Sequence, residues 1–98
     1  MFHVVIIAGP DEGRSFNLVE GQTLSVGRGQ SSDTKISDPR VSRVHCKIRL
    51  KRGKVTIADA GSVGGTLVNG RSVQQKQLAA GDLIQIGEML YIETSYRN

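Results

Sequence analysis

The sequence is poor in aromatic residues, with two phenylalanines, two tyrosines and no tryptophan among 98 residues. So few rings make it hard to build a platform on which the bases of a single-stranded nucleic acid stack. The single cysteine, Cys46, excludes an internal disulfide and offers no metal-ligand spacing, which favours a reducing cytoplasm. No hydrophobic run approaches the ~20 residues of a membrane-spanning helix, and residues 1–8 lack the features of a signal peptide. We therefore expect a cytoplasmic protein without a membrane anchor, a metal or a cofactor.

The remaining composition is that of an ordinary soluble domain, with 38% hydrophobic and 22% charged residues. Thirteen basic and nine acidic residues give a formal net charge of +4, which favours anionic partners in general. The sequence contains no internal repeat, low-complexity tract or linker. A single domain over residues 1–98 is predicted, with a polar tail from about residue 94.

Short strand-like runs separated by turn residues predict an all-β fold of the sandwich or barrel type. The clearest run, 45–51, alternates hydrophobic and basic residues, which is the pattern of a half-buried antiparallel strand. No segment has a convincing helical period, although 74–80 could hold one short helical turn. The predicted strands are residues 3–8, 15–19, 23–26, 45–51, 54–59, 66–68, 83–86 and 89–93.

Three short clusters lie where strand-like runs give way to loops: Gly27-Arg28, Ser42-Arg43-Val44-His45 and Asn69-Gly70. They supply two guanidinium groups, a hydroxyl and an amide. The planar donor fork of arginine matches the oxygens of a phosphate group. The first two clusters bound a long polar excursion, residues 27–43, and such loops often carry function. The Asn-Gly pair is also the preferred dipeptide of a tight hairpin turn.

With these clusters, the segment 59–70 and the ending 80–87, the chain resembles a forkhead-associated (FHA) domain along almost its whole length. The resemblance implies a two-sheet antiparallel β-sandwich whose loops at one end bind phosphothreonine peptides. It also implies that Arg28 and Ser42 contact the phosphate and that Arg43 contacts the phosphate or the ligand main chain. The expected function is a non-enzymatic module that recruits a phosphothreonine-containing protein, or a phosphorylated segment of its own full-length protein.

The same resemblance assigns supporting roles to further residues. His45 would brace the binding loops from inside, Asn69 would hold a loop or the peptide backbone, and Gly27 and Gly70 would serve backbone geometry. Arg40 lies on the loop that meets ligand residues after the phosphothreonine. We hypothesise that it favours an acidic side chain about three residues C-terminal to the phosphate.

The sequence departs from the family pattern at two adjacent positions. Many members have Ser or Thr where Val63 stands, and this hydroxyl binds the phosphate. Many have Asn where Gly64 stands, and this side chain holds the ligand main chain. Ser62 could substitute for the missing hydroxyl, and the loop around Gly64 could offer backbone N–H groups instead. We expect weaker or less selective binding at the residues that flank the phosphate.

Three other interpretations are weighed against phosphopeptide binding. A catalytic pair of Ser42 and His45 is disfavoured, because no spacing groups an orienting carboxylate or an oxyanion hole with them. A basic nucleic-acid-binding domain is disfavoured by the scarce aromatics. The more serious rival is a family member that has lost phosphate binding and serves as a structural or oligomerising domain.

The basic run over 47–54 is interpreted as the solvated face of a hairpin that discourages edge pairing.

Overall fold

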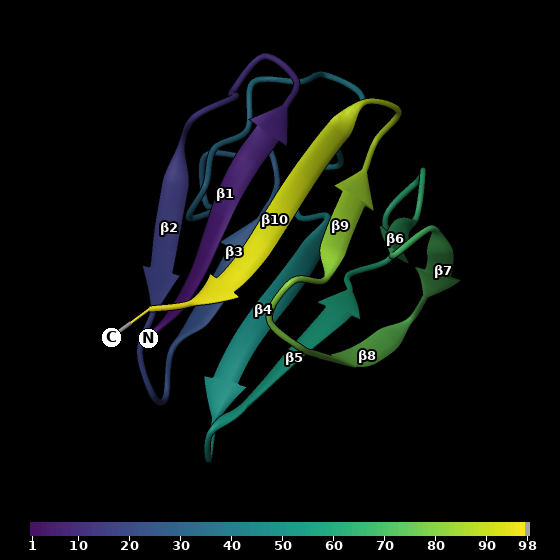
Figure 1. Ribbon diagram of the computed structural model, residues 1–98. Helices are drawn as coiled ribbons and strands as arrows, with labels where there is room; N and C mark the ends of the chain where they lie inside the picture. Colours follow the sequence, from purple (N-terminus) through teal and green to yellow (C-terminus); the bar gives the residue numbers. More distant parts are fainter. Residues whose placement is uncertain (98) are drawn as a thin grey trace.

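The computed structural model describes residues 1–97 and has two antiparallel sheets packed face to face (Figure 1). The first sheet has the strand order β2-β1-β10-β9-β6-β7, and the second has the order β3-β4-β5-β8. This arrangement confirms the predicted all-β sandwich. The strands are β1 (Phe2–Ala8), β2 (Ser15–Leu18), β3 (Thr23–Val26), β4 (Cys46–Lys51), β5 (Lys54–Asp59), β6 (Thr66–Val68), β7 (Arg71–Val73), β8 (Gln75–Leu78), β9 (Leu83–Ile86) and β10 (Leu90–Tyr96).

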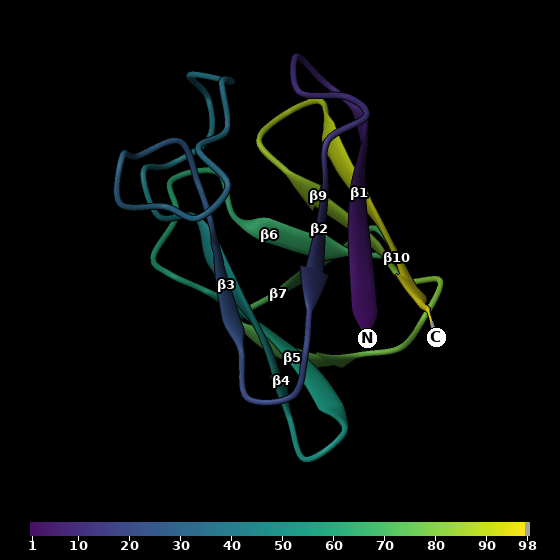
Figure 2. The same ribbon diagram turned by 90° about the vertical axis from the view of Figure 1, so that its left-hand side faces the viewer.

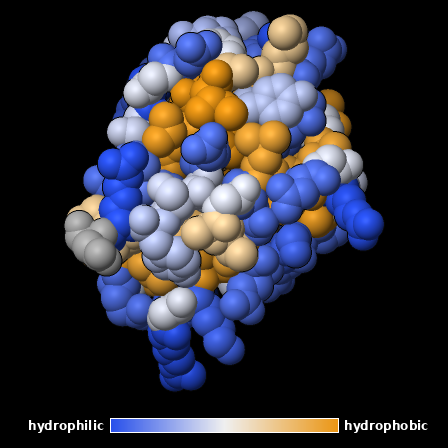
Figure 3. Space-filling view, in the orientation of Figure 1, coloured by the Kyte–Doolittle hydropathy of each residue, from blue (hydrophilic) through white to orange (hydrophobic). Residues whose placement is uncertain are grey.

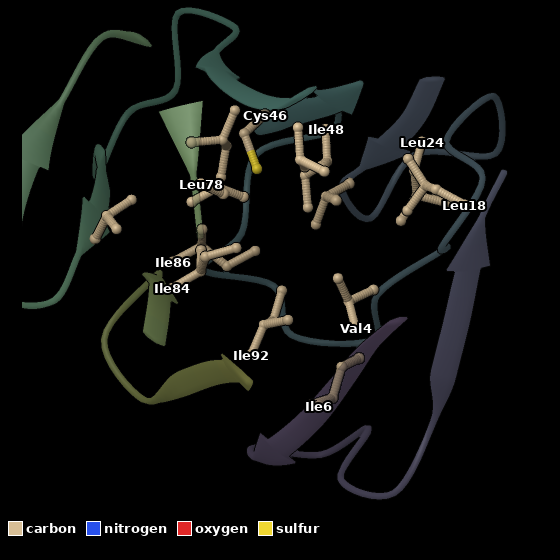
Figure 4. Close-up of a cluster of buried hydrophobic side chains, with 14 of the residues drawn as sticks. Val4, Ile6, Leu18, Leu24, Cys46, Ile48, Leu78, Ile84, Ile86 and Ile92 are labelled. Carbon is tan, nitrogen blue, oxygen red and sulfur yellow. The ribbon is translucent and has the colours of Figure 1, made fainter. Parts of the chain in front are cut away.

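The core lies between the sheets and is built from the alternate residues of each strand. Burial in β4 alternates strictly, with Cys46, Ile48 and Leu50 buried and the basic residues between them exposed. Figure 4 shows side chains of the first sheet, such as Ile84 and Ile92, facing those of the second across this layer. The period-2 signal in the sequence therefore identifies the buried face correctly.

Three parts of the sequence prediction differ from the structure. Residues 71–73, for which no strand is predicted, form β7, which pairs with β6. Residues 75–78 form a strand rather than a helical turn, because β8 pairs with β5 and places Leu78 opposite Val55. The predicted polar tail is also incorrect, since β10 continues to Tyr96 and pairs with β1 along its length. Thr94 is buried there, and its hydroxyl donates a hydrogen bond of 2.8 Å to the carbonyl of Asp82.

One end of the sandwich carries the long loops together with the β1–β2 and β9–β10 turns, and the β4–β5 hairpin lies at the other end. The loops over residues 27–45 and 60–65 lie together at the end of β3, β4 and β6, at the upper left of Figure 2. The β4–β5 hairpin protrudes at the opposite end, as the hydrophilic finger at the bottom of Figure 3, while hydrophobic residues show over β1, β9 and β10. The predicted hairpin turn at Asn69-Gly70 is confirmed, with φ of 51° and 82°.

Candidate functional site

The loop over residues 27–45 has no regular strand, yet its backbone is firmly bonded. The carbonyl of Gly27 accepts hydrogen bonds from the hydroxyls of Ser32 (3.0 Å) and Thr34 (3.1 Å) and from the amide of Ile36 (2.7 Å). Ile36 and Val41 are buried in the core. Buried hydroxyls and two hydrophobic anchors thus give this long loop a defined shape.

Gly27 allows the start of this loop to touch its end. A Cβ atom at Gly27 would lie 2.1 Å from the carbonyl oxygen of Arg43, a distance that no side chain tolerates. The amide of Arg28 donates to the carbonyl of Ser42 (3.2 Å), and that of Gly29 donates to the carbonyl of Arg43 (3.0 Å). The absence of a side chain at Gly27 therefore brings the first two sequence clusters together.

The Ser42 hydroxyl is oriented by the neighbouring loop. Its oxygen accepts a hydrogen bond of 3.0 Å from the amide of Val63, which leaves the hydroxyl hydrogen free to be donated elsewhere. The side chains of Arg28 and Arg43 are exposed, and within residues 1–97 neither guanidinium has an ion-pair or hydrogen-bond partner. Three unoccupied donors thus lie on adjoining backbone segments at this end of the molecule.

His45 is completely buried and connects the two loops. Its Nδ1 accepts a hydrogen bond from the amide of Ser42 (3.2 Å), and its Nε2 lies 2.7 Å from the carbonyl of Gly65. These partners require Nε2 to carry the hydrogen. Within residues 1–97 the Ser42 hydroxyl is bonded to Val63 and not to the imidazole, so His45 is not placed as a base for that hydroxyl.

Asp59 organises the second loop, a role that the sequence analysis missed. Its carboxylate accepts hydrogen bonds from the hydroxyls of Ser62 (2.6 Å) and Thr66 (2.7 Å) and from the amides of Gly61 and Ser62 (3.1 Å each). Burial opposes ionisation, but these hydrogen bonds prevail and lower the pKa of the Asp59 carboxyl. The motif of an Asp followed by a Gly-Ser turn could have indicated such a cap.

Ser62 is consequently not free to replace the family's missing hydroxyl. Its hydroxyl donates a hydrogen bond to Asp59, and its oxygen accepts one from the amide of Gly65 (2.9 Å). Of the suggested functions for Ser62, the structure therefore favours loop positioning over ligand contact. The Val63 side chain beside it is 97% exposed, and a Cβ at Gly64 would meet no atom within 4 Å.

Arg40 is held by two acidic side chains of the domain. Its Nε and Nη2 donate to the carboxylate of buried Asp38 at 3.0 and 3.1 Å, and its Nη1 donates to exposed Glu88 at 3.1 Å. The hydrogen bond from the Arg40 side chain is the main reason why the pKa of Asp38 is lowered. Sequence spacing had not linked Asp38 to any partner.

Asn69 lies at the other end of β6 from the 60–65 loop. Its carboxamide donates to the carboxylate of Asp82 (2.9 Å) and accepts from the amide of Leu83 (2.9 Å). Both groups of the side chain are therefore used to fix the β6–β7 turn against the start of β9. Of the two roles suggested for Asn69, positioning of a loop fits these contacts.

Comparison with known structures decides the family. An FHA domain solved for an analysis of phosphothreonine-dependent FHA domain interactions is 34% identical, with a TM-score of 0.86, over 99% of this chain and 97% of that chain. The FHA domain of CT664 from Chlamydia trachomatis is 32% identical, with a TM-score of 0.91, over 99% of this chain and 98% of that chain. The chain belongs to the forkhead-associated family.

Other matches are to longer proteins. This FHA domain is 41% identical to the glycogen accumulation regulator GarA of Mycolicibacterium smegmatis over 85 residues, which are 87% of this chain and 53% of GarA. The chain thus spans about half the length of that relative. Residues 5–94 also match a family model described as the cytoplasmic domain of an inner membrane component of T3SS. Within residues 1–97 no helix is long and hydrophobic enough to cross a membrane, and no cluster of three or more potential ligands is placed to hold a metal.

Proposed function

We propose that this FHA domain binds phosphothreonine peptides and so joins proteins after a Ser/Thr kinase has acted. The observation that carries the proposal is the Ser42 hydroxyl, whose oxygen is bonded to the Val63 amide while its hydrogen is free. The exposed guanidinium groups of Arg28 and Arg43 belong to the adjoining backbone segments. The analysis of phosphothreonine-dependent interactions of a 34% identical FHA domain supports the same role.

These donors suit a phosphothreonine in charge and in number. The phosphate carries about −1.5 to −2 charge near pH 7 and three strong acceptor oxygens. A hydrogen bond to a charged group contributes roughly 1.5–3 kcal/mol, and micromolar affinity corresponds to about 8 kcal/mol. Two or three such bonds, reduced by the ordering of the peptide, give the reversible binding that signalling requires.

The domain is proposed to act as a binding module rather than as an enzyme. The bonding of Ser42 to Val63, with His45 turned to backbone groups, supports this view. Its partner is a phosphothreonine-containing protein in trans or a phosphorylated segment of the same full-length protein. The cytoplasmic location and the absence of a cofactor remain predictions from the sequence.

The test is calorimetric titration with phosphothreonine peptides selected from a degenerate library. Wild-type protein is expected to bind them, and Arg28→Ala is expected to show no detectable binding. Ser42→Ala is expected to weaken binding by about 10- to 150-fold, the value of one hydrogen bond to a charged group. Arg71→Ala, an exposed arginine on β7, is the control that loses the same charge.

Unphosphorylated versions of the same peptides are expected to bind negligibly. Equal binding of the two forms, or equal loss in Arg28→Ala and Arg71→Ala, would contradict phosphate recognition at this site. Failure of all phosphopeptides to bind the wild type would favour the rival interpretation, a structural family member without phosphate binding.

A further inference from the structure

The outer face of the second sheet carries a row of unpaired basic side chains. Lys47, Arg49 and Lys51 alternate along β4 and all point away from the core, while Arg52 and Lys54 follow at the hairpin. The ion pairs within residues 1–97 involve Arg14 and Arg40 only. In this part of the chain, none of the five cations in the row therefore forms an ion pair.

The fold does not require these charges. The interpretation that they protect a sheet edge is wrong, because β4 lies inside the sheet between β3 and β5. The actual edge strands, β3 and β8, present uncharged Thr23 and Gln77 on this face, in the same cross-strand row as Arg49. Lys51 lies directly opposite Lys54, and like charges in such a pair destabilise a sheet. The row is thus a cost to stability that the sheet itself does not explain.

Short neighbours turn the row into a groove. Thr56 and Ala58 on β5 lie opposite Arg49 and Lys47, and they line a hollow together with all five cations. Two acidic side chains of adjoining segments already accept hydrogen bonds from other groups. Asp33 accepts from the amide and hydroxyl of Ser25 on β3, and Glu20 accepts from the amides of the β4–β5 turn. A concave surface lined by one sign of charge concentrates its field on an anionic ligand.

The groove lacks what a nucleic-acid surface of this kind would use. The four aromatic residues lie on strands of the other sheet: Phe2 on β1, Phe16 on β2, and Tyr91 and Tyr96 on β10. No ring in the second sheet is therefore available for base stacking. Successive cations on β4 are about 6.6–6.8 Å apart along the strand, which is also the spacing of alternate side chains in an extended peptide.

We propose that this groove is a second docking surface, which binds an extended acidic segment of a protein partner with carboxylates at alternate positions. The contact is independent of phosphorylation and goes beyond the phosphothreonine site. Charge complementarity and the two-residue period identify the occupant. The row begins at Lys47, two residues after His45, so one partner could occupy both surfaces in succession.

The experiment is an NMR titration with an unphosphorylated 13-residue peptide of alternating Glu and Ser, compared with the same peptide carrying Gln in place of Glu. The Glu peptide is expected to shift amide signals of β4 and β5, and the Gln peptide is expected to shift none. Lys47→Gln/Arg49→Gln should weaken binding by about two- to thirtyfold, the combined value of two exposed ion pairs. Arg71→Gln/Arg97→Gln removes the same charge elsewhere and should weaken it less than twofold.

Three outcomes would overturn the proposal. Equal weakening by the two double variants would show that only net charge matters. Binding of the Gln peptide as strong as that of the Glu peptide would exclude recognition of carboxylates. Tighter binding of a 12-base-pair DNA duplex than of the Glu peptide, lost in Lys47→Gln/Arg49→Gln, would assign the groove to nucleic acid. Arg28→Ala should leave binding of the Glu peptide unchanged, so failure of the phosphate site and failure of the groove are separable.

Discussion

At Arg40, two acidic residues of the domain already hold the guanidinium that a ligand carboxylate would need. Asp38 is buried and bonded twice, whereas Glu88 is exposed and bonded once. Exposed pairs of this kind are weak, so a ligand carboxylate can replace Glu88 but not Asp38. Arg40 therefore acts as a selectivity residue only if the ligand competes successfully with Glu88.

Removal of that competitor should reveal the selectivity. Glu88→Gln is expected to strengthen binding about two- to fivefold for a phosphothreonine peptide with Asp three residues after the phosphate. The matched peptide with Asn at that position should be unaffected, and Arg40→Ala should make the two peptides bind equally. Calorimetry on both peptides checks this, and an equal gain for both in Glu88→Gln would exclude a role for Arg40 in selectivity.

Gly64 offers a second test at the scale of single residues. A side chain there meets open space, and φ is not positive, so the loop can accept one without strain. Gly64→Asn should strengthen phosphopeptide binding about two- to tenfold by adding one hydrogen bond to the ligand main chain. Gly64→Ala is the control and should bind as the wild type does. A gain in both variants would point to a stiffer loop rather than to a new bond.

Single residues differ in how well the sequence predicts them. Arg28, Ser42 and His45 stand in the short clusters that carry the resemblance to the FHA family, so the sequence alone identifies them as candidate site residues. Asp38 and Asp59 are isolated carboxylates, and their partners are selected by loop conformation rather than by spacing. The exposure of Val63 and the engagement of the Ser62 hydroxyl likewise follow from how the 60–65 loop closes on Asp59.

At the scale of elements, the contact between the two ends of the 27–45 loop depends on Gly27. Gly27→Ala should lower the free energy of unfolding by about 2 kcal/mol or more, since the added methyl overlaps the Arg43 carbonyl. Gly29→Ala, with its nearest contact at 3.1 Å, should cost less, and Gly64→Ala should cost under about 0.5 kcal/mol. Urea unfolding measures the loss of stability in each of the three variants. A different ranking of these losses would contradict the close approach of Gly27 to the Arg43 carbonyl.

The 60–65 loop gives the domain an acid-sensitive element. Hydrogen bonds hold the pKa of Asp59 below its ordinary value of 3.8. Its stabilising effect is therefore full above that value and is lost as the pH falls through the lower folded-state pKa. Asp59→Asn should be less stable than the wild type at pH 7 but should lose less further stability between pH 4 and pH 2. Urea unfolding at these pH values measures the stability of both proteins. Equal losses of stability in the wild type and in Asp59→Asn would exclude Asp59 as a source of the acid sensitivity.

Among the elements, strands with a buried alternating face were predictable, whereas the edge strands β7 and β8, which bury few residues, were not. β4 buries every second residue, so its pattern appears directly in the sequence. β8 is an edge strand of mostly exposed polar residues, and only its pairing with β5 makes it extended. The end of β10 was missed for a related reason, because Thr94 is polar yet buried and satisfied by backbone carbonyls.

At the scale of the whole molecule, folding and binding should respond to pH in separate ranges. Asp11, Asp33, Asp38, Asp59 and Asp82 all have pKa values lowered from 3.8. Hydrogen bonds stabilise the charged forms, so the stability that these carboxylates contribute is retained down to about pH 4 and is lost below it. A change in binding between pH 7.5 and 5.5 therefore does not arise from these groups.

Phosphopeptide affinity should nevertheless fall within that range. The phosphate loses its second negative charge near pH 6, while arginine side chains in general keep their charge at any pH used here. If the dianion is the species bound, affinity at pH 5.5 is about fourfold weaker than at pH 7.5. Calorimetry at both pH values measures the loss, and thermal unfolding at pH 5.5 confirms that the domain is intact. An affinity that is constant across this range, in a folded protein, would mean that the second phosphate charge is not recognised.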